Sequence, residues 1–226
     1  MTQTLARVEA AVRAAGLTPR GAFHPGPGDG VPAAAPGRPA ATLVLVGNAG
    51  PAMWAAFAAA CDPDRDLLDD WSRRVVGGLA RDLGAAACFP FDAPPLPFQR
   101  WARRAEPCHP SPLGIFIHAR YGLWHGYRGA LLFADRLDLP PQDPAPSPCD
   151  TCDGRPCLSA CPVAAFTGAG YDTAACAGHL AADAGRDCMA GGCRARHACP
   201  VGQEYAYAPA QQRFHMAAFR RAMGRG

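Results

Sequence analysis

Apolar residues recur at helical spacing near the start of the chain. Leu5, Val8 and Val12 fall on one stripe within residues 4–15, with polar and small residues between them. A repeat of three to four residues is typical of a helix that buries one face, and glycine readily ends a helix. The pattern therefore predicts an amphipathic helix over residues 4–15 that stops at Gly16.

A different pattern, a short run of consecutive apolar residues, occurs at residues 42–46. Such a run between turn residues is typical of a strand that is buried on both faces. Gly47 and Gly50 follow the run, and Pro51 is a residue type favoured in the first turn of a helix. We therefore expect a strand, a loop and a helix in succession.

The longest helical pattern follows. Asp62 and Pro63 have the residue types of an N-cap and a first helical position, and Asp64 and Asp66 would lie near the positive end of the helix. The apolar residues after them keep helical spacing up to a glycine at position 84: Leu68, Trp71, Val75, Leu79 and Leu83. We expect one helix that starts at Asp62.

Shorter apolar runs at residues 85–91, 114–118 and 129–133 predict further strands. Residues 139–148 are half proline, a composition typical of a stiff linker. Residues 209–223 carry apolar positions on one helical side. They predict a closing helix after the linker and the cysteine-rich segment.

Composition narrows the kind of protein. No apolar run approaches the roughly 20 residues that a membrane span needs, and the N-terminus has no basic stretch followed by an apolar signal region. We therefore expect a cytoplasmic protein without a membrane partner. The formal net charge is only +3, and all 22 basic residues are arginine. So small an excess gives nucleic-acid binding little support.

Eight of the eleven cysteines fall within residues 149–199. The first four read Cys-x2-Cys-x4-Cys-x3-Cys-Pro, close to the bacterial ferredoxin run whose fourth cysteine ligates the other cluster of a pair. Reducing compartments disfavour disulfides, so metal ligation is the better use of these thiols. The crossed arrangement assigns one [4Fe–4S] cluster to Cys149, Cys152, Cys157 and Cys199, and the other to Cys161, Cys176, Cys188 and Cys193.

Other uses of the cysteines remain open. Two zinc sites would suit repeated Cys-x2-Cys knuckles, but only one such pair is present and both Cys-Pro pairs favour iron. A single cluster with spare cysteines is a further alternative, as are metals that only staple a domain. Outside the run, we expect Cys61 and Cys88 to be small buried hydrophobes. Cys108 and His109 are weaker candidates for chemistry, and we expect them in a loop.

Residues 112–133 read PLGIFIHARYGLWHGYRGALLF. This segment resembles the CblC cobalamin-processing family, in which a strand ending in His-Pro-Arg-Phe-Gly-Gly-Trp-Phe leads to Arg-Gly and another apolar strand. A weaker likeness extends over residues 1–140. Ala119 replaces the family's proline, and His125 stands where phenylalanine is usual.

The cysteine half resembles the cluster domain of epoxyqueuosine reductase and reductive dehalogenases, whose catalytic cores are similar to CblC. The resemblance implies an α+β chain with a nitroreductase-like, cofactor-binding α/β core over residues 1–140. A ferredoxin-like two-cluster domain would occupy residues 141–207. A C-terminal helix within residues 208–226 would pack back on the core.

The resemblance also implies a cobalamin pocket. Glycines would let the backbone approach a large planar ligand, aromatic rings would offer apolar surface, and arginines would bind polar groups of the corrin. The residues in question are Gly114, His118, Arg120, Tyr121, Trp124, Arg128 and Gly129. The structural alternative is that the arginines pair with carboxylates and that His118 is a hydrogen-bonded core histidine.

Together these features predict an iron–sulfur oxidoreductase that passes single electrons from two clusters to bound cobalamin, for corrinoid reduction or removal of an upper ligand. A flavin is the less favoured cofactor. An external electron donor is required, and the resemblance permits a homodimer. The alternative is a ferredoxin-like electron carrier whose N-terminal domain docks a partner protein. No acidic residue of the segment matches the proton donor of epoxyqueuosine reductase, which disfavours queuosine chemistry.

Overall fold

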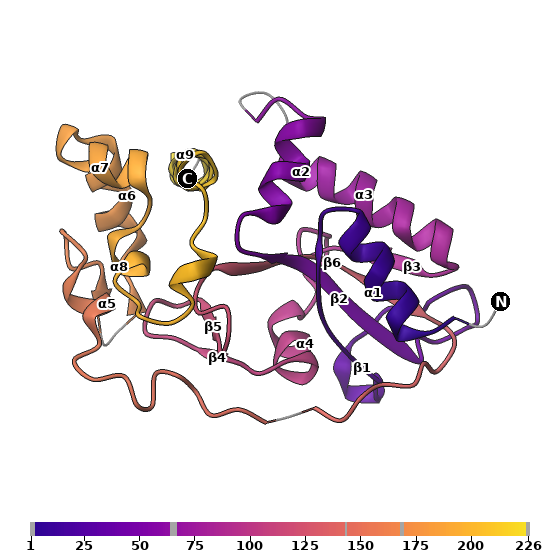
Figure 1. Cartoon of the computed structure of the whole chain (residues 1–226). Coiled ribbons are helices and arrows are strands. Elements are labelled where there is room, and N and C mark those ends of the chain that lie inside the picture. Colours follow the sequence, from indigo (N-terminus) through magenta and orange to yellow (C-terminus); the bar gives the residue numbers. More distant parts are fainter. Residues whose placement is uncertain (1–2, 64–66, 143, 168–169, 225–226) are drawn as a thin grey trace. The chain divides into compact units, whose positions relative to one another are not determined.

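The computed structural model describes residues 3–63, 67–142, 144–167 and 170–224. It is 42% helical and 18% strand, an α+β protein. The chain forms two compact units (Figure 1). The first comprises Met1–Pro107 and His125–Pro144, and the second comprises Cys108–Trp124 and Ala145–Gly226.

The first unit contains a four-stranded sheet in the order β1-β2-β6-β3, with antiparallel neighbours throughout. Its strands are β1 (Thr18–Phe23), β2 (Thr42–Ala49), β6 (His125–Phe133) and β3 (Ala86–Cys88). The strands expected at residues 42–46 and 129–133 form the centre of this sheet, and both are longer than predicted. Strand β1 was not predicted, because its proline and glycine are poor strand formers.

Helices cover this sheet. They are α1 (Leu5–Ala14), α2 (Ala52–Ala60), α3 (Leu68–Leu83) and α4 (Phe98–Ala105), with a short 3-10 turn η1 (Pro27–Asp29). Figure 1 shows α3 on one side of the sheet and α4 on the other. Seven successive residues of β2 are buried because both faces of the strand are covered.

The long helix does not start at Asp62. Helix α2 ends at Ala60, its C-cap Cys61 has an extended backbone, and α3 begins only at Leu68 after an extended Leu67. Asp69 and Asp70 supply the first-turn negative charges of α3, while Asp64 and Asp66 lie outside the described residues. The Asp-Pro pair therefore belongs to the connection between two helices.

The second unit is built from short elements around the cysteines. A hairpin joins β4 (Cys108–Pro110) to β5 (Phe116–His118), so the loop expected at Cys108 is wrong: the residue lies buried in a strand. The helices are α5 (Pro156–Ser159), α6 (Thr173–Ala181), α7 (Arg186–Gly191), α8 (Arg194–His197) and α9 (Pro209–Met223). Between them lie β7 (Phe166–Thr167), β8 (Gly170–Tyr171), η2 (Asp183–Gly185) and η3 (Gln203–Tyr205).

Residues 108–124 group with the cysteine half, whereas the resemblance put them in the first domain. The reason is apolar packing: Leu113, Ile117 and Leu123 share one buried cluster with Cys157 and Cys199. The closing helix α9 occupies its predicted range and packs on α6 and α7 of the same unit. Its expected packing partner had been the N-terminal core.

Across the described ranges, none of the helices has the length and apolar character needed to cross a membrane.

Candidate functional site

The first group of cysteines lies in an apolar setting. Cys157 is in α5 and Cys199 follows α8, and both side chains are buried in the cluster that contains Leu113, Ile117 and Leu123. Cys149 packs against the same cluster. Residues from both chain segments of the second unit therefore enclose these thiols.

Electrostatic interactions define the membership of this group. Burial raises the pKa of Cys157, and the charges of Cys199, Cys149 and Cys152 raise it further. Burial likewise raises the pKa of Cys149, to which Cys199 and Cys152 add, and burial and Cys152 raise the pKa of Cys199. Like charges act this way only at short range. Cys149, Cys152, Cys157 and Cys199 thus lie together.

The second group lines a cavity of about 180 Å³. The cavity wall includes all four of its members, namely Cys161, Cys176, Cys188 and Cys193. The remaining lining is largely apolar and includes Phe166, Tyr171, Leu180, Met216 and Phe219. The Tyr171 ring stacks on the Phe166 ring at a centroid distance of 4.7 Å. The four thiols therefore open into one sheltered space.

The thiols of the second group also interact with one another. Burial raises the pKa of Cys193, and the charges of Cys176 and Cys161 raise it further. Burial is also the main cause of the raised pKa of Cys188; Cys161 and Cys176 add to it, while Arg194 opposes it. The cysteines that raise the pKa of a thiol belong, in each case, to the same group as that thiol. Cys161 and Cys193 also pack against the apolar cluster that contains Cys157 and Cys199, so the two groups border each other.

Hydrogen-bond donors surround the sulfur atoms. The Ala165 N–H donates to Cys161 Sγ at 3.4 Å, backbone N–H groups at Arg196 and Ala195 donate to Cys193, and Val201 N–H donates to Cys199. Such bonds favour thiolates. They also resemble the contacts that set the reduction potentials of protein-bound iron–sulfur clusters.

The second cysteine group has room for more than a single enclosed water. In the described parts of the chain, no three histidine, cysteine or acidic side chains come together so as to hold one metal ion. The cavity of about 180 Å³ also far exceeds the roughly 10–15 Å³ that one enclosed water needs.

The predicted pocket residues on the second unit have partners within that unit. His118 is buried, and its Nδ1 accepts hydrogen bonds from the backbone N–H groups of Arg120 at 3.0 Å and Tyr121 at 3.2 Å. The Tyr121 ring stacks on His118, and Arg120 Nε donates to the Tyr205 hydroxyl at 2.7 Å. These contacts give His118 and Tyr121 a role in closing the turn after β5.

Trp124 is a core residue of the second unit, with 1% of its surface exposed. The Arg196 guanidinium lies over the Trp124 ring at 4.5 Å and over the Tyr207 ring at 4.4 Å. Arg196 also donates to the Leu123 carbonyl oxygen. Gly114, by contrast, lies in a turn with φ of 72° and open space beside its α-carbon.

The last two predicted pocket residues belong to the first unit. Arg128 donates to Asp69 Oδ1 at 3.0 Å, and Gly129 packs closely against Val76 and Phe89. The seven residues thus divide between the units, five in the second and two in the first.

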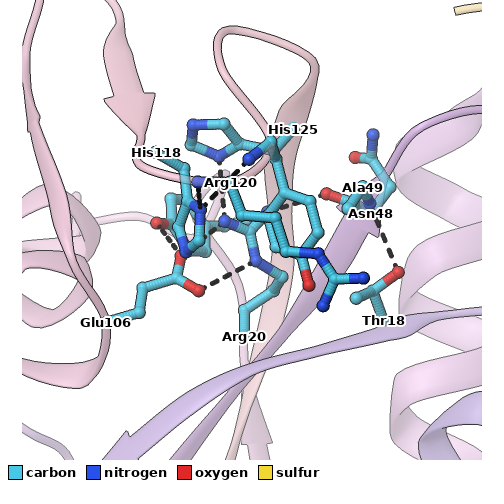
Figure 2. Close-up of polar contacts among 10 residues, drawn as sticks. Thr18, Arg20, Asn48, Ala49, Glu106, His118, Arg120 and His125 are labelled. Atoms are coloured by element: carbon cyan, nitrogen blue, oxygen red, sulfur yellow. Dashed lines mark hydrogen bonds and ion pairs between the residues drawn. The ribbon is translucent and has the colours of Figure 1, made fainter. Parts of the chain in front are cut away.

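A buried polar network in the first unit was not predicted (Figure 2). Arg20 is fully buried and holds Glu106 with two hydrogen bonds, Nε to Oε2 at 3.1 Å and Nη2 to Oε1 at 2.5 Å. Its Nη1 donates to the Asn48 carbonyl oxygen at 2.7 Å. Arg20 and Glu106 are 86 residues apart, so no local pattern could have paired them.

Two residues of β6 complete the network. The Tyr127 hydroxyl donates to Glu106 Oε1 at 2.5 Å. His125 Nδ1 lies 3.0 Å from Arg20 Nη2, and because arginine only donates, His125 must accept there and carry its proton on Nε2. Burial raises the pKa of Glu106, while the charge of Arg20 and the hydrogen bonds from Arg20 and Tyr127 lower it.

The sequence matches no protein-family model and no curated protein.

Proposed function

We propose that this chain is an electron-transfer protein that holds two [4Fe–4S] clusters. The observation that carries the proposal is the separation of eight cysteines into two sets of four, with Cys199 joining the first set and Cys161 the second. One cluster would be held by Cys149, Cys152, Cys157 and Cys199, and the other by Cys161, Cys176, Cys188 and Cys193.

The residues present fit such a group. The thiols are shielded by apolar side chains, and backbone N–H groups point at the sulfurs. Bound clusters supply one-electron transfer at potentials set by charge, hydrogen bonds and solvent exposure. The chain's contribution is to exclude water from the thiolates and to donate hydrogen bonds to them.

The electron acceptor that we propose is a corrinoid, bound by a CblC-like, nitroreductase-like core. This part rests on the resemblance of residues 112–133 to the cobalamin-processing family. The chain would reduce the corrinoid or remove its upper ligand, with a flavin as the less favoured cofactor. The protein would supply position and a polar environment, since the difficult chemistry belongs to the cofactor.

A second candidate function is a ferredoxin-like carrier whose first unit docks a partner protein. It is favoured by the buried position of Trp124 and by the backbone hydrogen bonds that His118 accepts. Side chains committed to their own unit are less available to a corrinoid.

The test begins with anaerobic purification and metal analysis. We expect roughly eight irons per chain, as two cubanes require, and electron paramagnetic resonance signals from two centres after reduction with dithionite. Cys152→Ala and Cys176→Ala should each remove one of the two signals, whereas Cys61→Ala, outside both groups, should remove neither. Zinc in place of iron would refute the cluster proposal.

Added cobalamin separates the two candidates. A corrinoid enzyme should retain cobalamin with a shifted absorption spectrum, and the reduced protein should convert cob(III)alamin to a lower oxidation state. If no corrinoid binds while both cluster signals are present, the carrier function holds and the corrinoid acceptor is refuted.

A further inference from the structure

Helices α6, α7 and α9 border an open groove of about 510 Å³ in the second unit. Three exposed arginines line it, Arg186, Arg213 and Arg220, together with apolar side chains that include Leu180 and Met189. We call this surface the arginine groove. Its combination of positive charge and apolar surface is typical of a protein-binding surface rather than of a purely solvated face.

The charge of the groove is available to a partner. Its one acidic residue, Asp183, pairs with Arg186 at 2.7 Å, but the two side chains are 90% and 78% exposed, so the pair is weak. Arg213 and Arg220 lie two helical turns apart on α9. Within the described ranges, neither has an acidic side chain in ion-pair contact. The groove therefore presents a net positive surface.

The same three helices also form part of the wall of the cavity that the second cysteine group lines. Leu180 of α6 lines both the arginine groove and the cysteine cavity. On α7, Cys188 lines the cavity and its neighbour Met189 lines the groove. On α9, Phe219 lines the cavity and its neighbour Arg220 lines the groove. A molecule seated in the groove is thus separated from the second cysteine group by a single layer of helices.

We propose that the arginine groove docks an acidic electron-carrier protein, which delivers electrons to the second cysteine group. This inference rests on the proposed function. The carrier loses one electron and the chain gains one, and no covalent bond forms or breaks. A protein fits better than a nucleic acid, because the apolar surface between the arginines offers no phosphate contacts and the whole chain has a formal net charge of only +3.

The experiment uses the full chain with its metal and, as a probe, an oxidised plant-type [2Fe–2S] ferredoxin, which is acidic. Binding is measured by calorimetry at low salt for the native protein, for the double variant Arg213→Glu with Arg220→Glu, and for Arg221→Glu. The last residue is exposed on the same helix but does not line the groove. The rate of reduction by reduced ferredoxin and by dithionite is followed in parallel.

We expect the double variant to lose binding and ferredoxin-driven reduction by on the order of tenfold or more, since opposite charges accelerate and stabilise docking. Reduction by dithionite should not change, and Arg221→Glu should behave like the native protein. If the double variant binds ferredoxin as tightly as the native protein does, the docking site is overturned. The same holds if the native protein binds a short RNA through its charge but does not bind ferredoxin. If the purified chain contains no iron, the proposed function is refuted instead. The docking site can still be tested in that case, because calorimetry measures binding whether or not the chain is redox-active.

Discussion

Each free thiol in this chain has a reactivity set by its surroundings. Cys88 lies in strand β3 with 5% of its surface exposed. Burial, and to a lesser extent the charge of Asp92, raises its pKa to about 12. Cys61 is only half-buried and accepts a hydrogen bond from Arg74 at 3.1 Å, so the expectation that it would be fully buried is wrong.

We predict that iodoacetamide labels Cys61 in the folded protein at pH 8 and leaves Cys88 unlabelled. The thiolate is the reacting species, and with a pKa of about 12 only about one Cys88 in ten thousand is ionised at pH 8. Because a raised pKa keeps the proton on until higher pH, labelling of Cys88 should rise about tenfold per pH unit between pH 8 and 10.

Peptide mass spectrometry measures both sites in one sample, and the protein unfolded in urea serves as the control in which both react. Equal labelling of Cys88 and Cys61 in the folded protein at pH 8 would contradict the assigned environment.

Sequence patterns are most informative where chemistry is local. Ligand spacing and the prolines after Cys161 and Cys199 predict which cysteines share a cluster, and that assignment stays a prediction. The role of Trp124 could not be predicted, since its partners Arg196 and Tyr207 lie more than 70 residues further along. A motif specifies residue types, but the residues that contact those side chains in the fold come from distant parts of the chain.

Elements of the first unit are joined by the buried Arg20–Glu106 pair. Arg20 belongs to β1, and Glu106 is the C-cap of α4. Their side chains are 0% and 7% exposed, so removing one partner leaves the other as an uncompensated charge. Replacing both by apolar residues removes that penalty.

We predict that Glu106→Leu lowers the free energy of unfolding by about 3–5 kcal/mol. The double variant Arg20→Met with Glu106→Leu should lose less than Glu106→Leu alone. Urea denaturation of the full chain, followed by tryptophan fluorescence, measures both.

The exposed pair of Arg38 and Asp135 provides a matched control, with side chains 62% and 75% exposed. Arg38→Met should cost less than about 1 kcal/mol. If the double variant loses as much unfolding free energy as Arg20→Met and Glu106→Leu lose together, Arg20 and Glu106 are not coupled as described.

Helices and strands were predicted well where their pattern was long or continuous. The closing helix α9 and the central strands β2 and β6 follow from apolar spacing, which burial enforces. The start of α3 was misplaced because the residue types at Asp62 and Pro63 also suit a connection between helices. Helix α4 and the β4 strand were missed, since a short element is stabilised by tertiary packing more than by its own sequence.

For the molecule as a whole, the two units differ in what stabilises them. The first has a sheet with a continuous apolar centre. Among the described residues of the second, four of the five α-helices have nine residues or fewer, lengths that are not stable in isolation. Its buried residues gather around cysteines, so in the proposed cluster-bound form ligation would supply much of its folding free energy.

If the chain holds the proposed clusters, removing iron with a chelator under oxidising conditions should unfold the second unit and leave the first folded. Hydrogen exchange with mass spectrometry should show lost protection in α6, α7 and the β4–β5 hairpin. Protection should persist in β2 and β6. Loss of protection in β2 at the same rate as in α6 would contradict separate stabilisation, and so would unchanged protection throughout.

The division into units was the least predictable property. The proline-rich segment at residues 139–148 contains Pro144, where the second segment of the first unit ends. Nothing in residues 108–124 indicated that they leave the first unit, because their apolar residues would suit either core. Only the complementary surface, formed by cysteines that come later in the chain, decides where they pack.

The position of residues 108–124 in the second unit, between two segments of the first, has a consequence for biosynthesis. Leu113, Ile117 and Leu123 emerge from the ribosome before the cysteines on which they pack. At roughly 5–20 residues per second, the 75 residues from Trp124 to Cys199 take on the order of 4–15 s to be made. During this interval the apolar hairpin has no finished surface to cover it, so a nascent chain stalled before Cys199 should be a preferred client of chaperones. For the same reason, the cysteine half cannot be transplanted as one contiguous segment.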